Sequence, residues 1–179
     1  MIDDDYKYEF FKERLGVLDK SIIFDSFLKA ITVFDAGLDK EIIKNETVFS
    51  GEILVDSLYY FKLEPLRERW RRTSEIILQN QILQSSSSML EVIGYLTSNC
   101  EHKTMLADVL VTKKQIRVKN VSKLKIYERD FAGLSKFLTE IVELNPSKIN
   151  LRLKNISNEE DITKILNKIF IDKIYLINS

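Results

Sequence analysis

The sequence has few of the residues that disulfides, metal sites and tight turns require. Its 179 residues include one cysteine, one histidine, two prolines and five glycines. The single cysteine, Cys100, excludes an intramolecular disulfide and is typical of a reducing compartment. One cysteine and one histidine are too few for a structural zinc site. The scarce glycines form no glycine-rich loop of the kinds that bind nucleotide phosphates.

Long apolar runs are also missing. No stretch approaches the roughly 18 consecutive apolar residues that suggest a membrane span. Residues 3–5 are all aspartate, where a signal peptide would carry basic residues. Hydrophobic residues make up 45% of the chain and charged residues 30%, which is typical of a folded globular protein. We therefore expect a soluble cytoplasmic protein without a membrane partner.

No catalytic motif is evident in the sequence. Cys100 and His102 stand two residues apart, so their side chains diverge on a helix or lie roughly 7 Å apart along a strand. The acidic runs 3–5 and 159–161 stand at the predicted starts of helices, where carboxylates stabilise the helix dipole. We predict no metal, no cofactor and no catalytic residue. A magnesium enzyme built on Asp or Glu stays open as an alternative, because such sites leave little local pattern.

The first half of the chain has the periodicity of helices. Apolar residues recur every three or four positions, and Pro65 suits the first turn of the longest helix. The run Ser85–Ser88 is the only low-complexity segment and is the predicted interruption between helices. The helices or shorter elements predicted here cover residues 5–16, 21–35, 38–45, 52–61, 65–84, 89–98 and 104–110.

After residue 110 the apolar period changes from about 3.6 to two. Ile116 and Val118 alternate with cations, and Leu124 and Ile126 do the same after a gap of turn length, which predicts a β-hairpin. The hairpin is followed by two predicted helices, 130–145 and 158–170, and by two predicted strands, near 149–153 and 174–177. The predicted fold class is α+β: a helical N-terminal region, 1–86, and an α/β region, 87–179, with a small mixed sheet and packing helices. A single continuous domain is the alternative.

Charge is distributed unevenly along the chain, although the formal net charge is zero. Residues 1–60 hold 7 Lys and Arg against 13 Asp and Glu, 61–108 hold 6 against 6, and 109–179 hold 14 against 8. Such a gradient indicates an acidic partner, or attraction between the two halves of one or two copies.

The predicted hairpin carries the densest group of cations. We expect its apolar face to meet the core and its other face to carry Arg117, Lys119, Lys123 and Lys125. A positive face of this kind suits contact with the phosphates of DNA or RNA. Protection of an edge strand by lysines, or simple solvation, explains the same pattern. The candidate nucleic-acid-binding residues are Lys113, Lys114, Arg117, Lys119, Lys123, Lys125, Arg71 and Arg72.

The last two candidates belong to an arginine cluster, 67–72, around Trp70. An aromatic ring among arginines suits stacking on an exposed base. The alternative is a solvated helix face, on which Glu64, Glu68 and Glu75 pair with the arginines while Trp70 is buried.

Segment 89–126 resembles a winged helix-turn-helix domain in its order of helix, turn, second helix and hairpin. The second helix and turn would be Leu106 to Thr112. The segment departs from that pattern, because the turn lacks the usual small residue and residues 116–126 alternate as strands do. The resemblance therefore implies DNA contact without an obvious recognition helix.

These patterns favour a non-enzymatic interaction or regulatory protein that acts through a protein partner or by self-association. The alternative is a nucleic-acid-binding protein that uses the basic hairpin 113–125.

Overall fold

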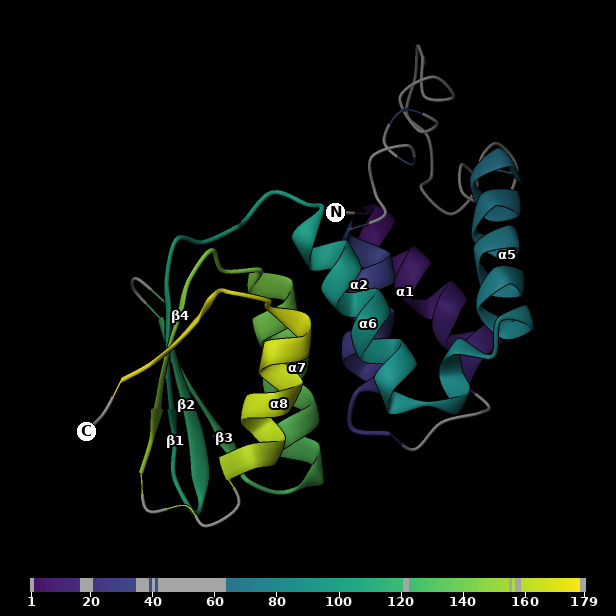
Figure 1. Ribbon diagram of the computed structural model, residues 1–179. Coiled ribbons are helices and arrows are strands. Elements are labelled where there is room, and N and C mark those ends of the chain that lie inside the picture. The colour runs from purple at the N-terminus through teal and green to yellow at the C-terminus, as the bar shows by residue number, and fades with distance from the viewer. Residues whose placement is uncertain are drawn as a thin grey trace.

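The protein has an α+β fold in which helices come first and a mixed sheet follows (Figure 1). The computed structural model describes residues 2–16, 21–34, 39, 41, 64–120, 123–154, 156 and 159–177. The helices are α1 (Ile2–Leu15), α2 (Phe24–Phe34), α5 (Glu64–Gln79), α6 (Ser86–Ser98), α7 (Phe131–Leu144) and α8 (Glu159–Ile169), with a short 3₁₀ helix η2 (Ile82–Gln84). The strands are β1 (Ala107–Val111), β2 (Gln115–Asn120), β3 (Lys123–Glu128), β4 (Ile149–Leu153) and β5 (Ile174–Leu176). The predicted fold class is confirmed.

The five strands form one sheet in the order β3-β2-β1-β4-β5. The first three strands in sequence form an antiparallel meander, with β1 against β2 and β2 against β3. β1 also pairs in parallel with β4, which pairs in parallel with β5. β1 is therefore the central strand, and β3 and β5 are the edges.

The elements are stacked in layers. Figure 1 shows α7 and α8 on one side of the sheet, with α2 and α6 beyond them and α1 and α5 farther still. α2 contacts both α6 and α7, and α6 also contacts α8. No described element lies on the other side of the sheet in this view. The two helices α7 and α8 are thus enclosed between the sheet and the helical layer, while the described elements leave the other face of the sheet open.

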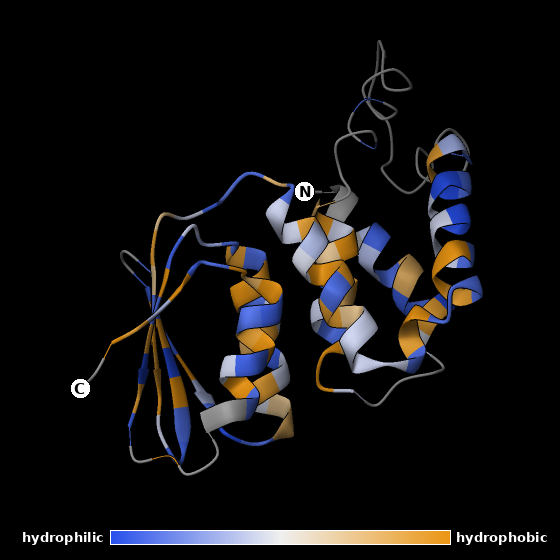
Figure 2. Ribbon diagram, in the orientation of Figure 1, coloured by the Kyte–Doolittle hydropathy of each residue, from blue (hydrophilic) through white to orange (hydrophobic). Residues whose placement is uncertain are grey.

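One apolar cluster extends through these layers. It includes Phe27 and Leu28 from α2, Phe137 from α7, and Val109 and Leu151 from the centre of the sheet. Figure 2 shows apolar residues alternating with hydrophilic ones along the strands, as expected for a sheet with one covered face. The division into regions 1–86 and 87–179 stays a prediction.

Close contacts join α6 and α8. A Cβ atom on Gly94 would lie 2.6 Å from the backbone oxygen of Lys168, so glycine permits the approach of the two helices. The hydroxyl of Thr97 donates to the backbone oxygen of Ile169 over 3.0 Å. These contacts attach α8 to α6, on the side of α8 that lies away from the sheet (Figure 1).

The serine run begins a helix instead of interrupting one. Ser85 is the N-cap of α6, and its hydroxyl accepts hydrogen bonds from the backbone N–H groups of Ser87 and Ser88. Ser86–Ser98 then forms the helix, three residues longer at its start than predicted. The prediction treated four serines as a break, but only the first has the extended backbone of a cap.

The predicted helix at 104–110 is wrong, because residues 107–111 form the central strand β1. Leu106 and Leu110 stand four residues apart, a spacing that is also typical of one face of a helix. Their neighbours Ala107, Val109 and Val111 alternate and are fully buried. Pairing of β1 with β2 on one side and β4 on the other decides its conformation. The winged helix-turn-helix interpretation of 89–126 is also wrong, because β1, β2 and β3 follow α6 and the described residues of that segment form no second helix.

The remaining predicted elements within the described ranges are present. The last turn of the helix predicted at 65–84 is separate, because α5 ends at Gln79 and η2 follows. α7 ends at Leu144, before the left-handed Asn145, whose positive φ of 35° closes the helix one residue ahead of Pro146. The elements predicted at 38–45 and 52–61 lie outside the described residues, apart from Asp39 and Glu41.

Candidate interaction surfaces of the sheet

The predicted β-hairpin is present, and its register decides where its cations lie. β2 and β3 pair so that Arg117 is opposite Ile126 and Val118 is opposite Lys125. An odd-numbered residue of β2 therefore lies across from an even-numbered residue of β3. Residues directly opposite each other in a ladder share one face of the sheet.

The expectation that four cations share one face is therefore wrong. Arg117 and Lys119 are on the open face, and Lys123 and Lys125 are on the face that α7 covers. The apolar residues are divided in the same way: Ile116 and Val118 are buried against the helices, whereas Leu124 and Ile126 lie on the open face. The division of the cations between two faces follows from the spacing of the strands, because only two residues separate Asn120 from its partner Lys123. A hairpin with so short a connection places same-parity residues on opposite faces.

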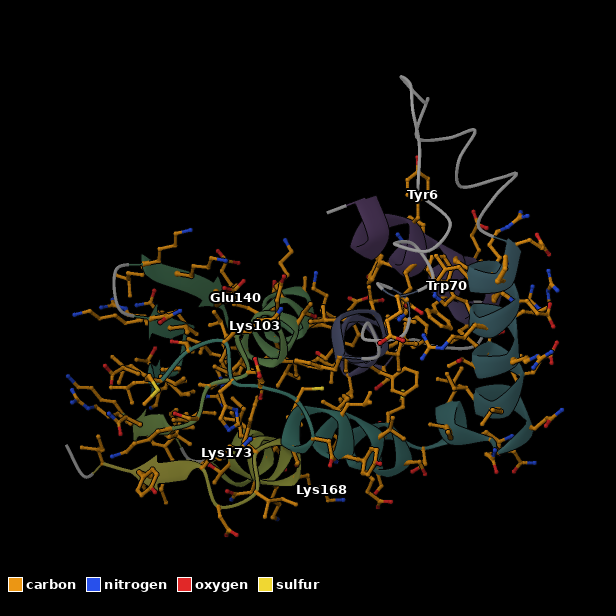
Figure 3. The ribbon with its side chains drawn as sticks, turned by 90° about the horizontal axis from the view of Figure 1, so that it is seen from above. Tyr6, Trp70, Lys103, Glu140, Lys168 and Lys173 are labelled. Carbon is orange, nitrogen blue, oxygen red and sulfur yellow. The ribbon has the colours of Figure 1, made fainter. Side chains whose placement is uncertain are left out.

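The open face combines apolar and cationic side chains. Leu124 is 59% exposed, Ile126 55% and Tyr175 50%. Figure 3, viewed from above, shows side chains that end in nitrogen extending outward from the sheet. The side chains that the strand register places on this face are Asp108, Leu110, Gln115, Arg117, Lys119, Leu124, Ile126, Glu128, Asn150, Arg152 and Tyr175.

All three cations that the register places on the open face extend into solvent. Arg117, Lys119 and Arg152 are exposed, and none of the three forms an ion pair with another described residue. The acidic Asp108 accepts a hydrogen bond of 2.8 Å from the side-chain amide of Asn150. This hydrogen bond joins the two polar side chains at the centre of the face, and the cations around them stay exposed.

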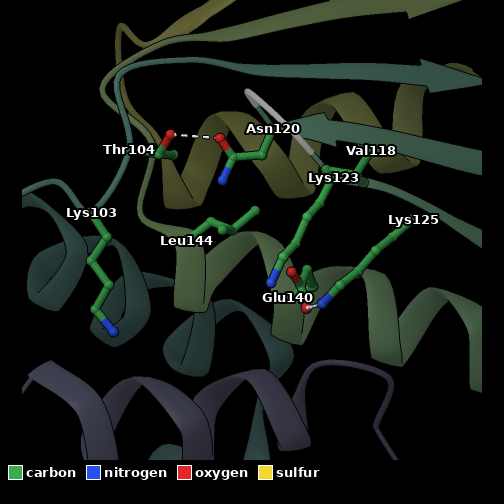
Figure 4. A pocket seen from close by; sticks show the side chains of 8 residues that line it. All are labelled: Lys103, Thr104, Val118, Asn120, Lys123, Lys125, Glu140 and Leu144. Atoms are coloured by element: carbon green, nitrogen blue, oxygen red, sulfur yellow. Dashed lines mark hydrogen bonds and ion pairs between the residues drawn. The ribbon is translucent and has the colours of Figure 1, made fainter.

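On the covered face, one cation forms an ion pair with a helix. Lys125 donates to Glu140 of α7 over 2.5 Å. Burial, with a smaller contribution from the Glu140 carboxylate, raises the pKa of the neighbouring Tyr127 to about 12. Lys123 lies near this pair at the end of the hairpin, where Figure 4 shows it extending toward Glu140. The edge of the hairpin is thus held to α7 by charge as well as by apolar contact.

Lys113 and Lys114 stand in the turn between β1 and β2, and both are exposed. The backbone oxygen of Lys114 accepts a hydrogen bond from the N–H of Arg129 over 2.9 Å. This turn lies at the end of the hairpin away from Asn120 and Lys123. The structure therefore places the six predicted hairpin cations in three groups: the turn, the open face and the covered face.

Arg71 and Arg72 are separated from the hairpin. They stand on α5 beside Trp70, which Figure 3 places at the far end of the molecule from the sheet. Arg71 pairs with Glu64 and Glu68, and Arg72 also pairs with Glu68. Trp70 itself is buried, 1% exposed. The two arginines thus form no continuous surface with the hairpin cations.

A buried ionic cluster lies in the helical part, where the sequence patterns did not predict one. Lys7 is 2% exposed and Asp39 1%. The Asp39 carboxylate accepts from the Lys7 ammonium over 2.6 Å, from the indole N–H of Trp70 over 3.1 Å, and from Arg69. The helical spacing of Lys7 with Phe11 was the available indication, because it places a lysine on an apolar face. The cluster joins α1 to α5 at Asp39.

No metal site or membrane span is evident among the described residues. No three side chains of His, Cys, Asp or Glu within these ranges gather closely enough to hold a metal ion. Cys100 and His102 lie in the loop between α6 and β1, and the Cys100 thiol donates to the backbone oxygen of Phe34 over 3.4 Å. None of the described helices combines the length and apolar character that crossing a bilayer requires.

Comparison with protein-family models, with curated proteins and with solved structures found no match to this chain.

Proposed function

We propose that this chain is a non-enzymatic cytoplasmic interaction protein that binds an acidic protein partner through the open face of its sheet. The observation that carries the proposal is the exposure of Leu124, Ile126 and Tyr175 on a face that also holds exposed cations. Exposed apolar side chains surrounded by polar ones are typical of protein interfaces. Burying these side chains would supply affinity, and the cations would orient and accelerate docking.

The charge of the face argues for an acidic partner over a second copy bound face to face. Arg117, Lys119 and Arg152 outnumber the acidic Asp108 and Glu128 on this surface. A two-fold contact would place this face against itself and bring the same cations together. Like charges brought together without partners oppose association. A partner with carboxylates around an apolar centre avoids that repulsion.

The aromatic content of the face favours protein over single-stranded nucleic acid. Sequence-tolerant binding of single strands uses several aromatic rings on which successive bases stack. Tyr175 is the only aromatic side chain that the register places on this face, and the Lys148 ammonium already lies 4.3 Å from the centre of its ring. The aliphatic Leu124 and Ile126 offer no comparable stacking surface.

Copurification from host cells tests the proposal. The variant combines Leu124→Glu with Ile126→Glu, and the matched control combines Tyr95→Glu with Ile171→Glu, two exposed apolar residues outside the sheet. We expect an acidic protein to be recovered with the wild type and the control and to be lost with the variant. The recovered protein should then bind the purified chain more weakly as salt is raised. Identical recoveries with variant and control would refute the role of the open face.

A nucleic-acid-binding protein is the second candidate. It is favoured by the exposure of Lys113, Lys114, Arg117 and Lys119, none of which pairs with an acidic group among the described residues. Phosphate contacts by such cations would make affinity fall steeply from low to moderate salt.

Fluorescence anisotropy with labelled single- and double-stranded oligonucleotides tests this candidate. Reversing Arg117, Lys119, Lys123 and Lys125 to glutamate should abolish binding if the hairpin is responsible. Reversing Arg71 and Arg72 instead tests the α5 cluster separately. Absence of binding at low salt would eliminate the nucleic-acid hypothesis.

A further inference from the structure

A cavity of about 370 Å³ lies between the end of the β2–β3 hairpin and α7, on the covered side of the sheet (Figure 4). Its size is within the usual range of small-molecule sites. Three lysines line it, Lys103 from the loop before β1 and Lys123 and Lys125 from β3. Elements distant in the sequence thus direct cationic side chains to one hollow.

The cavity has more positive than negative charge. Glu140 is the one carboxylate in its wall, and it is engaged by Lys125 over 2.5 Å. The Lys103 ammonium lies 5.9 Å from the centre of the Phe34 ring. Lys123 has no ion-pair partner within the part of the chain that the structure describes. Two lysines of the cavity are therefore not balanced by a carboxylate in its wall.

A side-chain amide adds directed hydrogen-bond donors. The hydroxyl of Thr104 donates to Asn120 Oδ1 over 2.8 Å. This bond occupies the oxygen of the amide and leaves the Asn120 amide nitrogen to donate. The side chains of Val118 and Leu144 complete the lining with apolar surface.

We infer that this cavity binds the phosphate group of a small phosphorylated molecule. Ammonium groups and an amide N–H are the donors that phosphate oxygens accept, and hydrogen bonds between ionised groups are stronger than neutral ones. An anion in the cavity would also reduce the repulsion among its lysines. The apolar wall suits the carbon framework that carries the phosphate. The inference does not rest on the proposed function, because the partner surface is on the opposite face of the sheet.

Titration calorimetry of the full chain with pyrophosphate at low salt tests the inference. The variant combines Lys103→Ala with Lys123→Ala, and the control combines Lys113→Ala with Lys114→Ala, which removes the same charge from exposed lysines at the other end of the hairpin. We expect saturable binding that weakens at least about tenfold in the variant. The control should change affinity less than about twofold, since its lysines lie outside the cavity.

Glu140→Gln gives a change of opposite sign. Removing the carboxylate frees Lys125 for the anion, so the affinity for pyrophosphate should rise severalfold. Unchanged or weakened binding in this variant would contradict the inference, as would equal losses in the lysine variant and its control. Absence of saturable binding to the wild type would also overturn it.

Two further ligands identify the source of the phosphate. Adenosine monophosphate represents small phosphorylated molecules, and a short single-stranded oligonucleotide represents a nucleic-acid backbone. Binding of the mononucleotide that depends on Lys103 and Lys123 alone supports the inference. Binding of the oligonucleotide that depends equally on Lys113 and Lys114 would overturn it in favour of a nucleic-acid surface.

Discussion

The helical end and the sheet end of this molecule use their cations in different ways. In the helical end, Lys7 and Arg69 share the buried carboxylate of Asp39, and the arginines of α5 pair with glutamates one turn away. At the sheet end, Arg117 and Lys119 extend from an open face without an ion pair among the described residues. The cations around Asp39 join separate segments and the arginines of α5 are neutralised within their own helix, whereas Arg117 and Lys119 stay exposed to solvent. The difference explains why equal numbers of acids and bases do not make the surface uniform.

Removing the buried carboxylate of the helical end should have the largest effect. Asp39→Asn keeps the shape of the side chain but removes the charge that Lys7 and Arg69 share, and breaking a buried pair in this way typically costs about 3–5 kcal/mol. We expect a loss of that size in the free energy of unfolding, measured with urea.

The control is Glu140→Gln, which breaks the partly exposed pair with Lys125 at the sheet end. It should cost less than about 1 kcal/mol, as surface pairs do. Similar losses in the two variants would remove the distinction between the two ends.

The two faces of the sheet give the next comparison. Ile116 is fully buried on the covered face, whereas Ile126 is 55% exposed on the open face. Ile116→Ala should cost about 2–5 kcal/mol of unfolding free energy, because it leaves a cavity in the core. Ile126→Ala should cost less than about 1 kcal/mol, since little apolar surface is lost from the interior. Equal costs would mean that the open face is covered within the folded chain.

Lys173 is an exception to the pattern at the sheet end. Its ammonium nitrogen is buried and has no hydrogen-bond partner in the described structure, and burial lowers the pKa of Lys173. Lys173→Met keeps the length of the side chain and removes the buried polar group, so it should raise the unfolding free energy by up to about 1 kcal/mol. The same urea titration measures this effect, with the exposed Lys154→Met as control. A loss of stability in Lys173→Met would show that the ammonium is partnered.

The smallest expected effect is on the pH dependence of stability. The pKa of Tyr127 is raised to about 12 by burial and by Glu140, above the ordinary value of 10.0. Between these values the folded state holds a proton that the unfolded state releases, so this contribution to stability is complete below pH 10.0 and is lost as the pH rises toward 12.

Because the chain has seven tyrosines, the Tyr127 pKa is measured as the difference in tyrosinate absorbance between each chain and its Tyr127→Phe counterpart during ultraviolet titration. Glu140→Gln should lower it toward the ordinary value, because one of the two causes of the shift is removed. Glu143→Gln, which breaks a pair with Lys29 instead, should leave it unchanged. A Tyr127 pKa that does not respond to Glu140→Gln would show that burial alone causes the shift.

Local patterns in the sequence determined most elements but not the surfaces that they form. The helical spacing of residues 131–144 and the alternation in 149–153 predicted α7 and β4, because each has one apolar side and clear end residues. The hairpin was predicted for the same reason, although its cations were placed on one face. Alternation within a strand shows which residues lie on the same side of that strand, but only the pairing register relates the sides of two strands.

Tertiary structure alone decided the central strand and the distribution of charge. Residues 107–111 became β1 because they pair with β2 and β4, contacts that no local period records. Lys103 meets Lys123 and Lys125 at one cavity, and Asp39 meets Lys7 and Arg69, only after segments far apart in the sequence are packed together. The sequence by itself determined the α+β composition and the number of cations near the hairpin. Long-range pairing determined which cations are neutralised and which remain for another molecule, because charges interact through space and not along the chain.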